Sequence, residues 1–467
     1  MFMNRNPILN TDSYKGSHFA QTPPDLTHMS SYVEARGSQD KSIKETVVIG
    51  IYAGCHEVFG TPITMANIDE AEDVFTKHGF NFNRAGWEYI LEKHDGFIPV
   101  EVVGVPEGTV LPISTPMMQI VNTDPELPWL TSYFETALLR AIWYATTVAT
   151  KSREIKKVLK RGMMETAGHC EGLDFMLHDF GCRGVSSYES AAIGGLAHLV
   201  NFQGTDTLPA IVYGRKHYNI DMAGYSVPAS EHSTITSWGM QNELLAHENM
   251  MDNFGVDNGT FSSVSDSFNI YETCRKYWGG ILKDRVIEFG SRGGTTVVRP
   301  DSGPLLESPS VPIECVQILM ECFGHTVNEL GFKVLPKYIR VLQGDGWKEA
   351  SDFVTFIKLL KAEKISMENF VFGMGGGLLQ NVNRDVFKFA MKASAVKDDK
   401  GWRDVYKNPV HKGKKSKKGH FTSVNLAGDY TTGEDDLLKD NILVTYYKDG
   451  TLTPPDDFEK IRKRAEV

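Results

Sequence analysis

The sequence predicts an α/β protein that combines a barrel domain with a further mixed α/β domain. Its 467 residues are more than one small core requires, and 41% of them are hydrophobic, which is enough for two or three cores. From about Phe175 onward, short β-type runs alternate with helical stretches. A polar cluster follows each β-type run, as happens at the carboxyl ends of barrel strands.

Composition excludes several classes of function. The net charge of -10 disfavours a general nucleic-acid binder, because the field of the whole molecule repels phosphate. The sequence has neither a signal peptide nor an apolar run of about 18 residues that could span a membrane. Its six cysteines form no CxxC pair, which argues against a zinc site or a disulfide framework. We therefore expect a soluble cytoplasmic protein without nucleic-acid or membrane partners.

The first domain is expected over residues 1–150, completed by 391–467. Residues 45–54, 98–115 and 117–123 are rich in β-type residues and are interrupted by Gly and Pro. Helical stretches are expected near 68–78 and 84–92. Residues 129–167 carry apolar side chains at helical spacing and predict one long helix or two shorter ones.

The barrel is expected over residues 151–390. Alternating strands and helices imply parallel strands with crossover connections. Within this region, residues 351–364 place Phe353, Phe356 and Leu360 on one helical face, as in a helix packed on a sheet. Seven polar clusters follow the strands and can line one pocket, although each alone is an ordinary loop: "HDFGCRGVSS", "FQGTDTLPA", "VPASEHSTITSW", "FSSVSDSFN", "VVRPDSGP", "RVLQGDGW" and "FGMGGGLLQ".

The last cluster places Gly375, Gly376 and Gly377 between an apolar run and a helix start. It matches neither a P-loop nor the dinucleotide-binding fingerprint. Glycine backbone at a strand-to-helix junction can approach an anion closely, and a helix N-terminus favours negative charge. A phosphate is the physical candidate, and a tight turn with close packing is the alternative.

Two further clusters carry carboxylates beside residues that shape the backbone. "RPDSG" joins Arg299 and Asp301 through a proline, so a cation and a carboxylate can enter one pocket. Arginine can bind a phosphate with two hydrogen bonds, whereas aspartate can accept ribose hydroxyls or face Mg²⁺. Asp345 lies between two glycines in "QGDG". Either segment is also compatible with a surface turn.

The remaining charged candidates suggest a ligand with several phosphates. His232 follows an acid in "ASEHST" and can act as acid, base or nucleophile, although a lone histidine is more often packed or solvated. Arg183, Asp206 and Arg384 add charge to other loops. The basic run at 411–420, "HKGKKSKKGH", is either a solvated loop or a phosphate contact.

Taken in order, these motifs resemble those of the nicotinamide phosphoribosyltransferases, a group of type II phosphoribosyltransferases. The match extends from "TDSYKGSH" through "HDFGCRGVSS", "GYSVPASEHSTITSWG", "RPDSG" and "FGMGGGLLQ" to "KKSKKG", which covers nearly the whole chain. The resemblance implies an irregular α/β barrel with a mixed α/β sandwich domain. It also implies transfer of a phosphoribosyl group from 5-phosphoribosyl 1-pyrophosphate to nicotinamide, with Mg²⁺, in NAD salvage.

The resemblance also implies roles for individual residues. Arg183, His232 and Arg299 would bind the pyrophosphate, with Arg299, His232 and Asp301 as the catalytic group. Ribose would contact Asp301, Gly344 and Asp345, and its 5-phosphate would contact Gly375, Gly376 and Arg384. Asp206 would bind the carboxamide, and the pyridine ring would stack between Phe180 and Tyr14 of the partner subunit in a homodimer with shared sites. Lys392 and Lys414 complete the expected substrate ligands, and no metal ligand is assigned.

The same resemblance implies that ATP transiently phosphorylates His232 and so couples its hydrolysis to product formation. Three positions depart from the pattern: Cys182 replaces an aromatic residue, Asn269 an acid, and Ala390 a small hydroxyl residue near Lys392. We expect the change at Asn269 to remove a carboxylate from the metal or ribose region and to leave Asp301 more isolated. A nicotinate-specific enzyme and a non-catalytic binding or signalling protein are the alternatives, and Asp206 favours the amide over the carboxylate.

Overall fold

The computed structural model describes residues 6–256, 258–410, 415–433 and 437–466, in two compact units. The first unit contains the chain up to Thr150 together with Val212–Asp221 and Val382–Glu466. The second contains Lys151–Ile211 and Met222–Asn381. Residues 212–221 and 382–390, which we assigned to the barrel, therefore group with the first unit.

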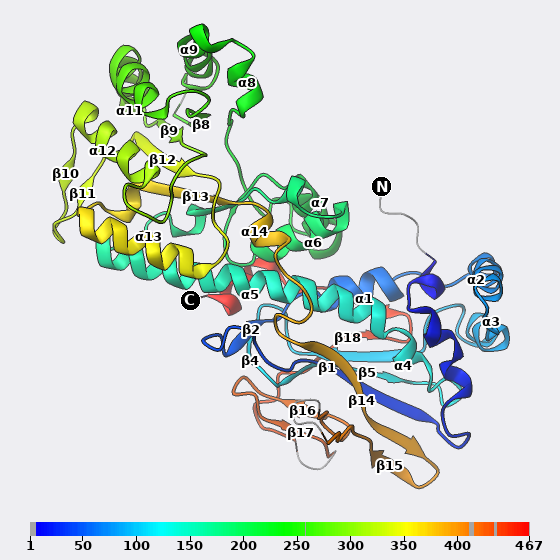
Figure 1. The fold of residues 1–467 in the computed structure, drawn as a ribbon. Helices are drawn as coiled ribbons and strands as arrows, with labels where there is room; N and C mark the ends of the chain where they lie inside the picture. The colour runs from blue at the N-terminus through cyan, green and yellow to red at the C-terminus, as the bar shows by residue number, and fades with distance from the viewer. Residues whose placement is uncertain (1–5, 257, 411–414, 434–436, 467) are drawn as a thin grey trace. The chain divides into compact units, whose positions relative to one another are not determined.

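The first unit is built on a seven-stranded antiparallel sheet in the order β15-β14-β1-β5-β3-β18-β19 (Figure 1). Its strands are β1 (His28–Ala35), β3 (Val100–Gly104), β5 (Pro116–Asn122), β14 (Phe389–Asp398), β15 (Gly401–Asp404), β18 (Val444–Lys448) and β19 (Thr451–Leu452). Two small antiparallel pairs are β2 (Glu45–Val47) with β4 (Val110–Pro112), and β16 (Ser423–Val424) with β17 (Tyr430–Thr431). The C-terminal segment thus completes a sheet that the N-terminal segment begins.

The first unit also contains several helices. They are η1 (Pro7–Leu9), η2 (Ser13–Ala20), α1 (Ile51–Phe59), α2 (Met65–Lys77), α3 (Arg84–Lys93), α4 (Leu130–Tyr133) and α15 (Phe458–Ala465). The long α5 (Glu135–Thr166) and α7 (Leu208–Tyr218) contribute residues to both units. The expected helices near 68–78, 84–92 and 129–167 are therefore confirmed as α2, α3 and the pair α4 and α5.

One segment of the first domain was predicted wrongly. Residues 45–54 read as β-rich, but only β2 is a strand and α1 begins at Ile51. Glu107, distant in sequence, accepts hydrogen bonds from the backbone N–H groups of Gly50 (2.7 Å) and Tyr52 (3.2 Å). This tertiary contact satisfies donors that a helix start leaves unpaired, and it overrides the local β propensity.

The second unit contains a six-stranded parallel sheet in the order β7-β6-β13-β12-β9-β8. The strands are β6 (Leu177–Asp179), β7 (Gly204–Thr205), β8 (Thr260–Val264), β9 (Thr295–Arg299), β12 (Ile339–Gln343) and β13 (Phe370–Met374). A short antiparallel pair, β10 (Thr326–Val327) with β11 (Lys333–Val334), lies outside it.

An irregular segment joins the two edge strands of this sheet. Tyr225 forms a parallel bridge to Gly204 at β7, and Ala229 forms a parallel bridge to Ser262 at β8. Residues 225–229 therefore take the place of a seventh strand, and the sheet closes into an irregular α/β barrel, which confirms the predicted fold class. The carboxyl ends of the strands consequently meet at one face.

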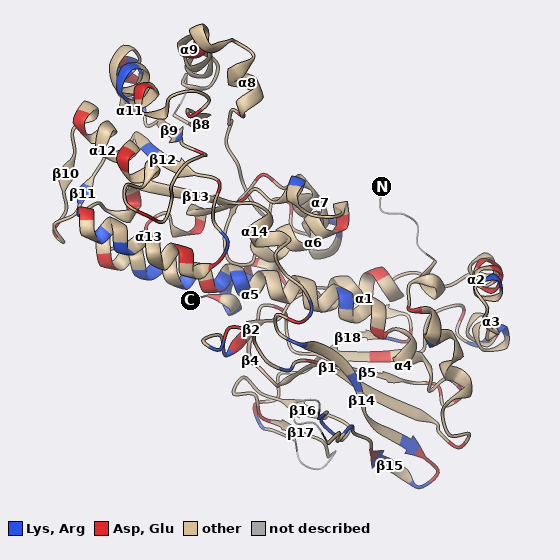
Figure 2. Ribbon diagram, in the orientation of Figure 1, with Lys and Arg blue, Asp and Glu red and all other residues tan. Residues whose placement is uncertain are grey.

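The connections between barrel strands are largely helical. They include η3 (Leu173–Phe175), η4 (Cys182–Gly184), α6 (Tyr188–His198), α8 (His232–Thr236), η5 (Met240–Asn242), α9 (Glu243–Phe254), α10 (Ile270–Glu272), the π-helix η6 (Thr273–Ile281), α11 (Lys283–Ser291), α12 (Val311–Phe323), α13 (Ala350–Glu363), η7 (Met367–Asn369) and α14 (Gly376–Leu379). Charged residues of both signs lie along α5 and α13 (Figure 2). The predicted apolar face of α13 packs on the sheet, where Phe353 and Phe356 contact Phe372 edge to face.

The structure also describes the state of the cysteines and the character of the helices. All six cysteines are free thiols. Within the described residues, no helix combines the length and the apolar character needed to cross a membrane.

Candidate active site

A cavity of about 240 Å³ lies within the barrel unit. Its lining includes three predicted site residues, Phe180, Asp206 and Arg299, which follow or end three different strands. Val297, Leu342 and Val371 add apolar surface from β9, β12 and β13. The arrangement is that of a small-molecule site, with apolar walls and a few convergent polar groups.

The cavity lining includes an aromatic ring, that of Phe180, and a carboxylate, that of Asp206. A Cβ atom added at Gly373 would lie 2.1 Å from the Phe180 ring, so only glycine allows that ring its position. Asp206 accepts a hydrogen bond from the hydroxyl of Ser226. The remaining acceptor capacity of the Asp206 carboxylate is suited to an amide N–H.

Arg299 and Asp301 project from the end of β9. Arg299 Nε lies 3.7 Å from Asp301 Oδ1, beyond hydrogen-bond distance, and this buried nitrogen has no hydrogen-bond partner. An unpaired buried N–H is costly, so the guanidinium is well placed to bind an anion. Gly344 packs against the same carboxylate, because a Cβ there would lie 2.9 Å from Asp301 Oδ1.

His232 has a carboxylate partner that the sequence analysis did not identify. Its Nε2 lies 3.0 Å from Asp266 Oδ1, and Asp266 Oδ2 accepts a hydrogen bond from the backbone N–H of Ser302 at 2.9 Å. Burial alone would raise the pKa of Asp266, but hydrogen bonds from Ser302 and His232 hold it below its usual value. Asp266 therefore stays ionised and orients the imidazole. Its place in the cluster "FSSVSDSFN" at the end of β8 was the available signal.

Asn269 does not leave Asp301 without carboxylate neighbours. Asn269 is the N-cap of α10, where its side chain accepts hydrogen bonds from the backbone N–H groups of Tyr271 and Glu272. Burial raises the pKa of Asp301, Arg299 opposes that shift, and the charges of Asp266 and Asp345 add to it. Asp301 thus has two carboxylate neighbours, and Asn269 serves the helix.

Arg183 and the glycine cluster also belong to this unit. Arg183 is largely exposed and lies 3.9 Å from Glu231, so it is a solvated cation with one weak partner. A Cβ at Gly184 would lie 3.2 Å from Gly376 N, which brings the "FGCRG" and "GGG" loops into close approach. The helix after the glycines, α14, has only four residues, so its dipole is weak and the close backbone approach is the stronger reason to expect an anion.

Two further predicted ligands, Arg384 and Lys392, lie in the first unit. Lys392 has its pKa lowered chiefly by burial, opposed by Glu135, and further lowered by the charges of Arg36, Lys15 and Arg384. The sequence analysis did not identify Lys15, which is buried and paired with Glu135, or Arg36. Lys15 and Lys392 share the Glu135 carboxylate, and the charges of Arg36 and Arg384 also act on Lys392, so positive charge gathers around Lys392 in a way suited to phosphate.

Three further positions singled out from the sequence are Tyr14, Ala390 and Lys414. Tyr14 is 55% exposed, and its ring contacts His18 edge to face and lies 5.3 Å from Lys15 Nζ. Ala390 is buried on β14 and pairs with Glu34 of β1. Lys414 lies outside the described residues.

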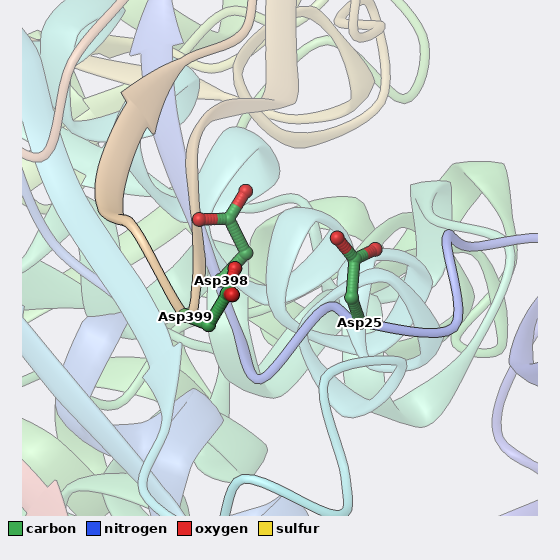
Figure 3. A group of neighbouring side chains, drawn as sticks. All are labelled: Asp25, Asp398 and Asp399. Carbon is green, nitrogen blue, oxygen red and sulfur yellow. The ribbon is translucent and has the colours of Figure 1, made fainter.

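Among the described residues, one group of three carboxylates is close enough to share a cation. Asp25, Asp398 and Asp399 of the first unit form this group (Figure 3). Asp398 already accepts a hydrogen bond from the Arg403 guanidinium at 3.2 Å. Exposed acidic groups of this kind are common on protein surfaces, and we assign this one no role.

Two family models match most of this chain. Residues 175–449 match the nicotinate phosphoribosyltransferase (NAPRTase) family, and residues 6–102 match the N-terminal domain of nicotinamide phosphoribosyltransferase. Two solved structures share the fold at low identity. They are nicotinate-nucleotide pyrophosphorylase from Pyrococcus furiosus (TM-score 0.62, 14% identity, covering 100% of this chain and 96% of that one) and human nicotinic acid phosphoribosyltransferase (TM-score 0.60, 13% identity, covering 97% and 92%).

Relatives of higher identity cover almost the full length. Nicotinamide phosphoribosyltransferase of Xanthomonas campestris pv. campestris is 43% identical over 99% of this chain and 98% of its own. The protein of the same name from Mycoplasma pneumoniae is 30% identical over 91% of this chain and 97% of its own. The chain therefore belongs to the nicotinamide phosphoribosyltransferases, within the nicotinate phosphoribosyltransferase family.

Proposed function

We propose that this protein transfers the 5-phosphoribosyl group of 5-phosphoribosyl 1-pyrophosphate to nicotinamide, yielding nicotinamide mononucleotide and pyrophosphate in NAD salvage. The observation that carries this proposal is the barrel cavity that brings Phe180, Asp206 and Arg299 together. An aromatic ring, an amide acceptor and an anion-binding guanidinium are the groups that a pyridine amide and a diphosphate require.

Base recognition depends on Phe180 and Asp206. The pyridine ring stacks on Phe180, and the carboxamide N–H donates to the Asp206 oxygen that Ser226 leaves open. A nicotinate carboxylate would face the Asp206 carboxylate instead. Like-charge repulsion then selects the amide.

The protein's part in the reaction is positioning and electrostatic stabilisation. The ring nitrogen attacks the anomeric carbon, the bond to pyrophosphate breaks, and the leaving group departs with its electron pair. Arg183 and Arg299 stabilise the negative charge of that leaving group, and His232 lies beside them as a further ligand. Gly344 and Asp345 hold the ribose, while Gly375 and Gly376, with Arg384, Lys392 and Lys414, hold the phosphates.

Mg²⁺ is part of the proposal because the site supplies the oxygen ligands it prefers. Asp301 has the charges of Asp266 and Asp345 near it, and the mutual repulsion of such carboxylates is relieved by a divalent cation. Asp301 and Asp345 are the residues that would hold it. When bound, the ion neutralises negative charge on the pyrophosphate.

ATP coupling through His232 is a finer part of the proposal. Asp266 accepts a hydrogen bond from the N–H group at Nε2 of His232. The lone pair of the neutral imidazole is therefore on Nδ1, and Nδ1 is the nucleophile. Nδ1 attacks the terminal phosphorus of ATP, the bond to ADP breaks, and the phosphohistidine is later hydrolysed by water. The short distance to Asp266 favours the imidazolium form that this attack creates.

A homodimer with shared sites accounts for Tyr14, Arg384 and Lys392, which belong to the first unit. In this arrangement, Tyr14 of the partner subunit covers the second face of the pyridine ring. The exposed ring of Tyr14 supports that role. A cytoplasmic location, where ATP is available, completes the proposal and suits six unpaired thiols.

The test is product formation by the purified protein. It is incubated with 5-phosphoribosyl 1-pyrophosphate, Mg²⁺ and either nicotinamide or nicotinate, and each mononucleotide is quantified by chromatography. Nicotinamide mononucleotide as the main product supports the proposal. Nicotinate mononucleotide as the main product would identify the nicotinate-specific alternative, and the absence of both would favour a non-catalytic protein.

A further inference from the structure

Asp179 is a buried acid that the proposed mechanism does not use. It is the last residue of β6, its side chain has no solvent exposure, and it is not among the residues that line the cavity. Its neighbours along the chain and across the sheet, however, are the turns that carry Phe180 and Asp206. We propose that Asp179 is the positioning residue of the base pocket, with one carboxylate holding both turns. This inference rests on the proposed function, because it names what fixes the nicotinamide site.

One oxygen of Asp179 holds the turn that carries Phe180. Oδ1 accepts a hydrogen bond from the backbone N–H of Gly181 at 2.7 Å. The backbone N–H of Phe180 donates to the carbonyl of Met374 at 3.0 Å. The residue between these two bonds is thus fixed at its backbone on both sides, and its ring is held over Gly373.

The other oxygen holds the turn that carries Asp206. Oδ2 accepts a hydrogen bond from the hydroxyl of Thr205 at 3.3 Å, and that hydroxyl accepts one from the backbone N–H of Thr207 at 3.0 Å. The carbonyl of Asp179 also accepts from the backbone N–H of Asp206 at 3.0 Å. Asp206 is therefore enclosed by three bonds that lead back to Asp179.

The geometry requires a carboxylate at this position. Both oxygens act as acceptors, whereas the NH₂ group of an asparagine cannot accept either bond: it would face the Gly181 N–H donor, or it would leave the Thr205 hydroxyl proton without this acceptor. Burial raises the pKa of Asp179 to about 6; the neighbouring Thr207 side chain and the hydrogen bonds from Gly181 and Thr205 oppose that rise, and the charge of Asp206 adds to it. A buried charge is unfavourable unless it is paired, so the two turns are what makes it tolerable here.

The space around Asp179 also leaves little room for adjustment. A Cβ at Gly195 would lie 3.1 Å from Asp179 Oδ2, and a Cβ at Gly181 would lie 3.0 Å from Oδ1. A longer acid therefore has no space, and Asp179→Glu should not restore the function. An error in the carboxyl position would displace the ring of Phe180 and the acceptor of Asp206 relative to each other.

The test separates positioning from simple stabilisation. Asp179→Asn and wild type are compared for kcat, for the KM values of nicotinamide and of the phosphoribosyl donor, and for thermal stability. We expect the KM of nicotinamide to rise by at least about tenfold, because a shift of about 1 Å in Phe180 and Asp206 weakens the contacts to the base. The KM of the phosphoribosyl donor should change by less than about twofold, because the residues that bind the donor are not displaced. Thr205→Val should act in the same direction, and Thr205→Ser should not.

Asn369→Asp is the matched control. Asn369 is also buried and also ties loops together, accepting from the backbone N–H of Leu335 at 2.7 Å and donating to the carbonyl of Ser366 at 2.7 Å. It precedes β13, at the opposite end of the sheet from Met374, which pairs with Asp179. The same exchange of amide and carboxylate there should lower stability and leave the KM of nicotinamide unchanged.

Three outcomes are decisive. Equal changes in both KM values, or the same pattern in Asn369→Asp, would make Asp179 a structural residue and overturn the inference. If Asp179→Asn does not fold, the comparison of Thr205→Val with Thr205→Ser decides in its place, and no difference in the KM of nicotinamide overturns the inference. Failure of the proposed function is seen separately, since wild type would then form no nicotinamide mononucleotide.

Discussion

His232 Nε2 lies 3.0 Å from Asp266 Oδ1, and Asp266 in turn accepts hydrogen bonds from Ser302. Because the Asp266 carboxylate is an acceptor, a neutral His232 donates from Nε2 and keeps its lone pair on Nδ1, which is the nitrogen that the proposed ATP coupling requires. The pairing explains how a histidine with a half-exposed side chain can be held for a specific task. It also makes the coupling to ATP testable at two residues.

The first prediction concerns that coupling. His232→Ala should abolish stimulation by ATP while some ATP-independent synthesis survives, because the binding groups of the barrel remain. Asp266→Asn should keep the nucleophile but lower the rate of phosphorylation by about 10²-fold, since the imidazolium loses its carboxylate. Labelled ATP should give wild type an acid-labile, base-stable phosphate that His232→Ala lacks. ATP-stimulated turnover without any such label would contradict the covalent mechanism.

The second prediction concerns the choice of substrate. Asp206→Asn should weaken the use of nicotinamide and relax the rejection of nicotinate, because the repelling charge disappears. A lost charge-assisted hydrogen bond corresponds to about 10- to 100-fold in the ratio of the two kcat/KM values. Competition between the two substrates at equal concentration measures that ratio. An unchanged ratio would remove Asp206 from the specificity role.

The third prediction concerns assembly. Tyr14→Ala and Arg299→Ala subunits should each be nearly inactive, because each change affects every shared site of a homodimer. Mixing them should restore part of the activity, since half of the sites in a mixed dimer carry neither change. Subunit exchange is verified by mass spectrometry of differently tagged chains. Verified exchange without recovery would indicate sites built within one chain.

The fourth prediction concerns the stability of the first unit at different pH. Burial raises the pKa of Glu107 from 4.5 to about 7, although hydrogen bonds from Tyr52 and Gly50 oppose the shift. A carboxyl group whose folded-state pKa is raised contributes stability below its unfolded pKa and loses it as pH rises through the folded value. The stability that Glu107 contributes should therefore be lost between about pH 4.5 and 7. The free energy of unfolding should fall by roughly 3 kcal/mol over this range.

Glu107→Gln provides the comparison, because the amide oxygen can still accept the same backbone hydrogen bonds. Calorimetric unfolding of both proteins at pH 5 and pH 8 should show wild type losing stability relative to the variant at the higher pH. A constant difference across this range would show that Glu107 does not titrate there.

The sequence predicted the barrel, the three long or amphipathic helices and three residues that line the barrel cavity, because those features are encoded locally. Phe353 and Phe356 share a helical face, and Arg299 and Asp301 follow a β-branched run. What it missed depends on contacts between distant segments. The helix at Ile51 requires Glu107, and the importance of Asp266 appears only when the ends of β8 and β9 bring it to Ser302.

Asn269 illustrates the same limit in the opposite direction. Because Asn269 replaces an acid of the family motif, the sequence indicated that a carboxylate was lost from the metal or ribose region. In the structure it caps α10, and Asp301 has Asp266 and Asp345 as charged neighbours. Spacing along the chain could not distinguish the capping residue Asn269 from Asp266, three positions before it, whose carboxylate contacts His232.

The most direct test of the account is a crystal structure of the protein with nicotinamide mononucleotide and pyrophosphate. We predict that the pyridine ring lies inside the barrel cavity, stacked on Phe180, with the carboxamide nitrogen within hydrogen-bond distance of Asp206 and the pyrophosphate on Arg299. A pyridine ring bound outside this cavity, or a carboxamide that does not contact Asp206, would contradict it.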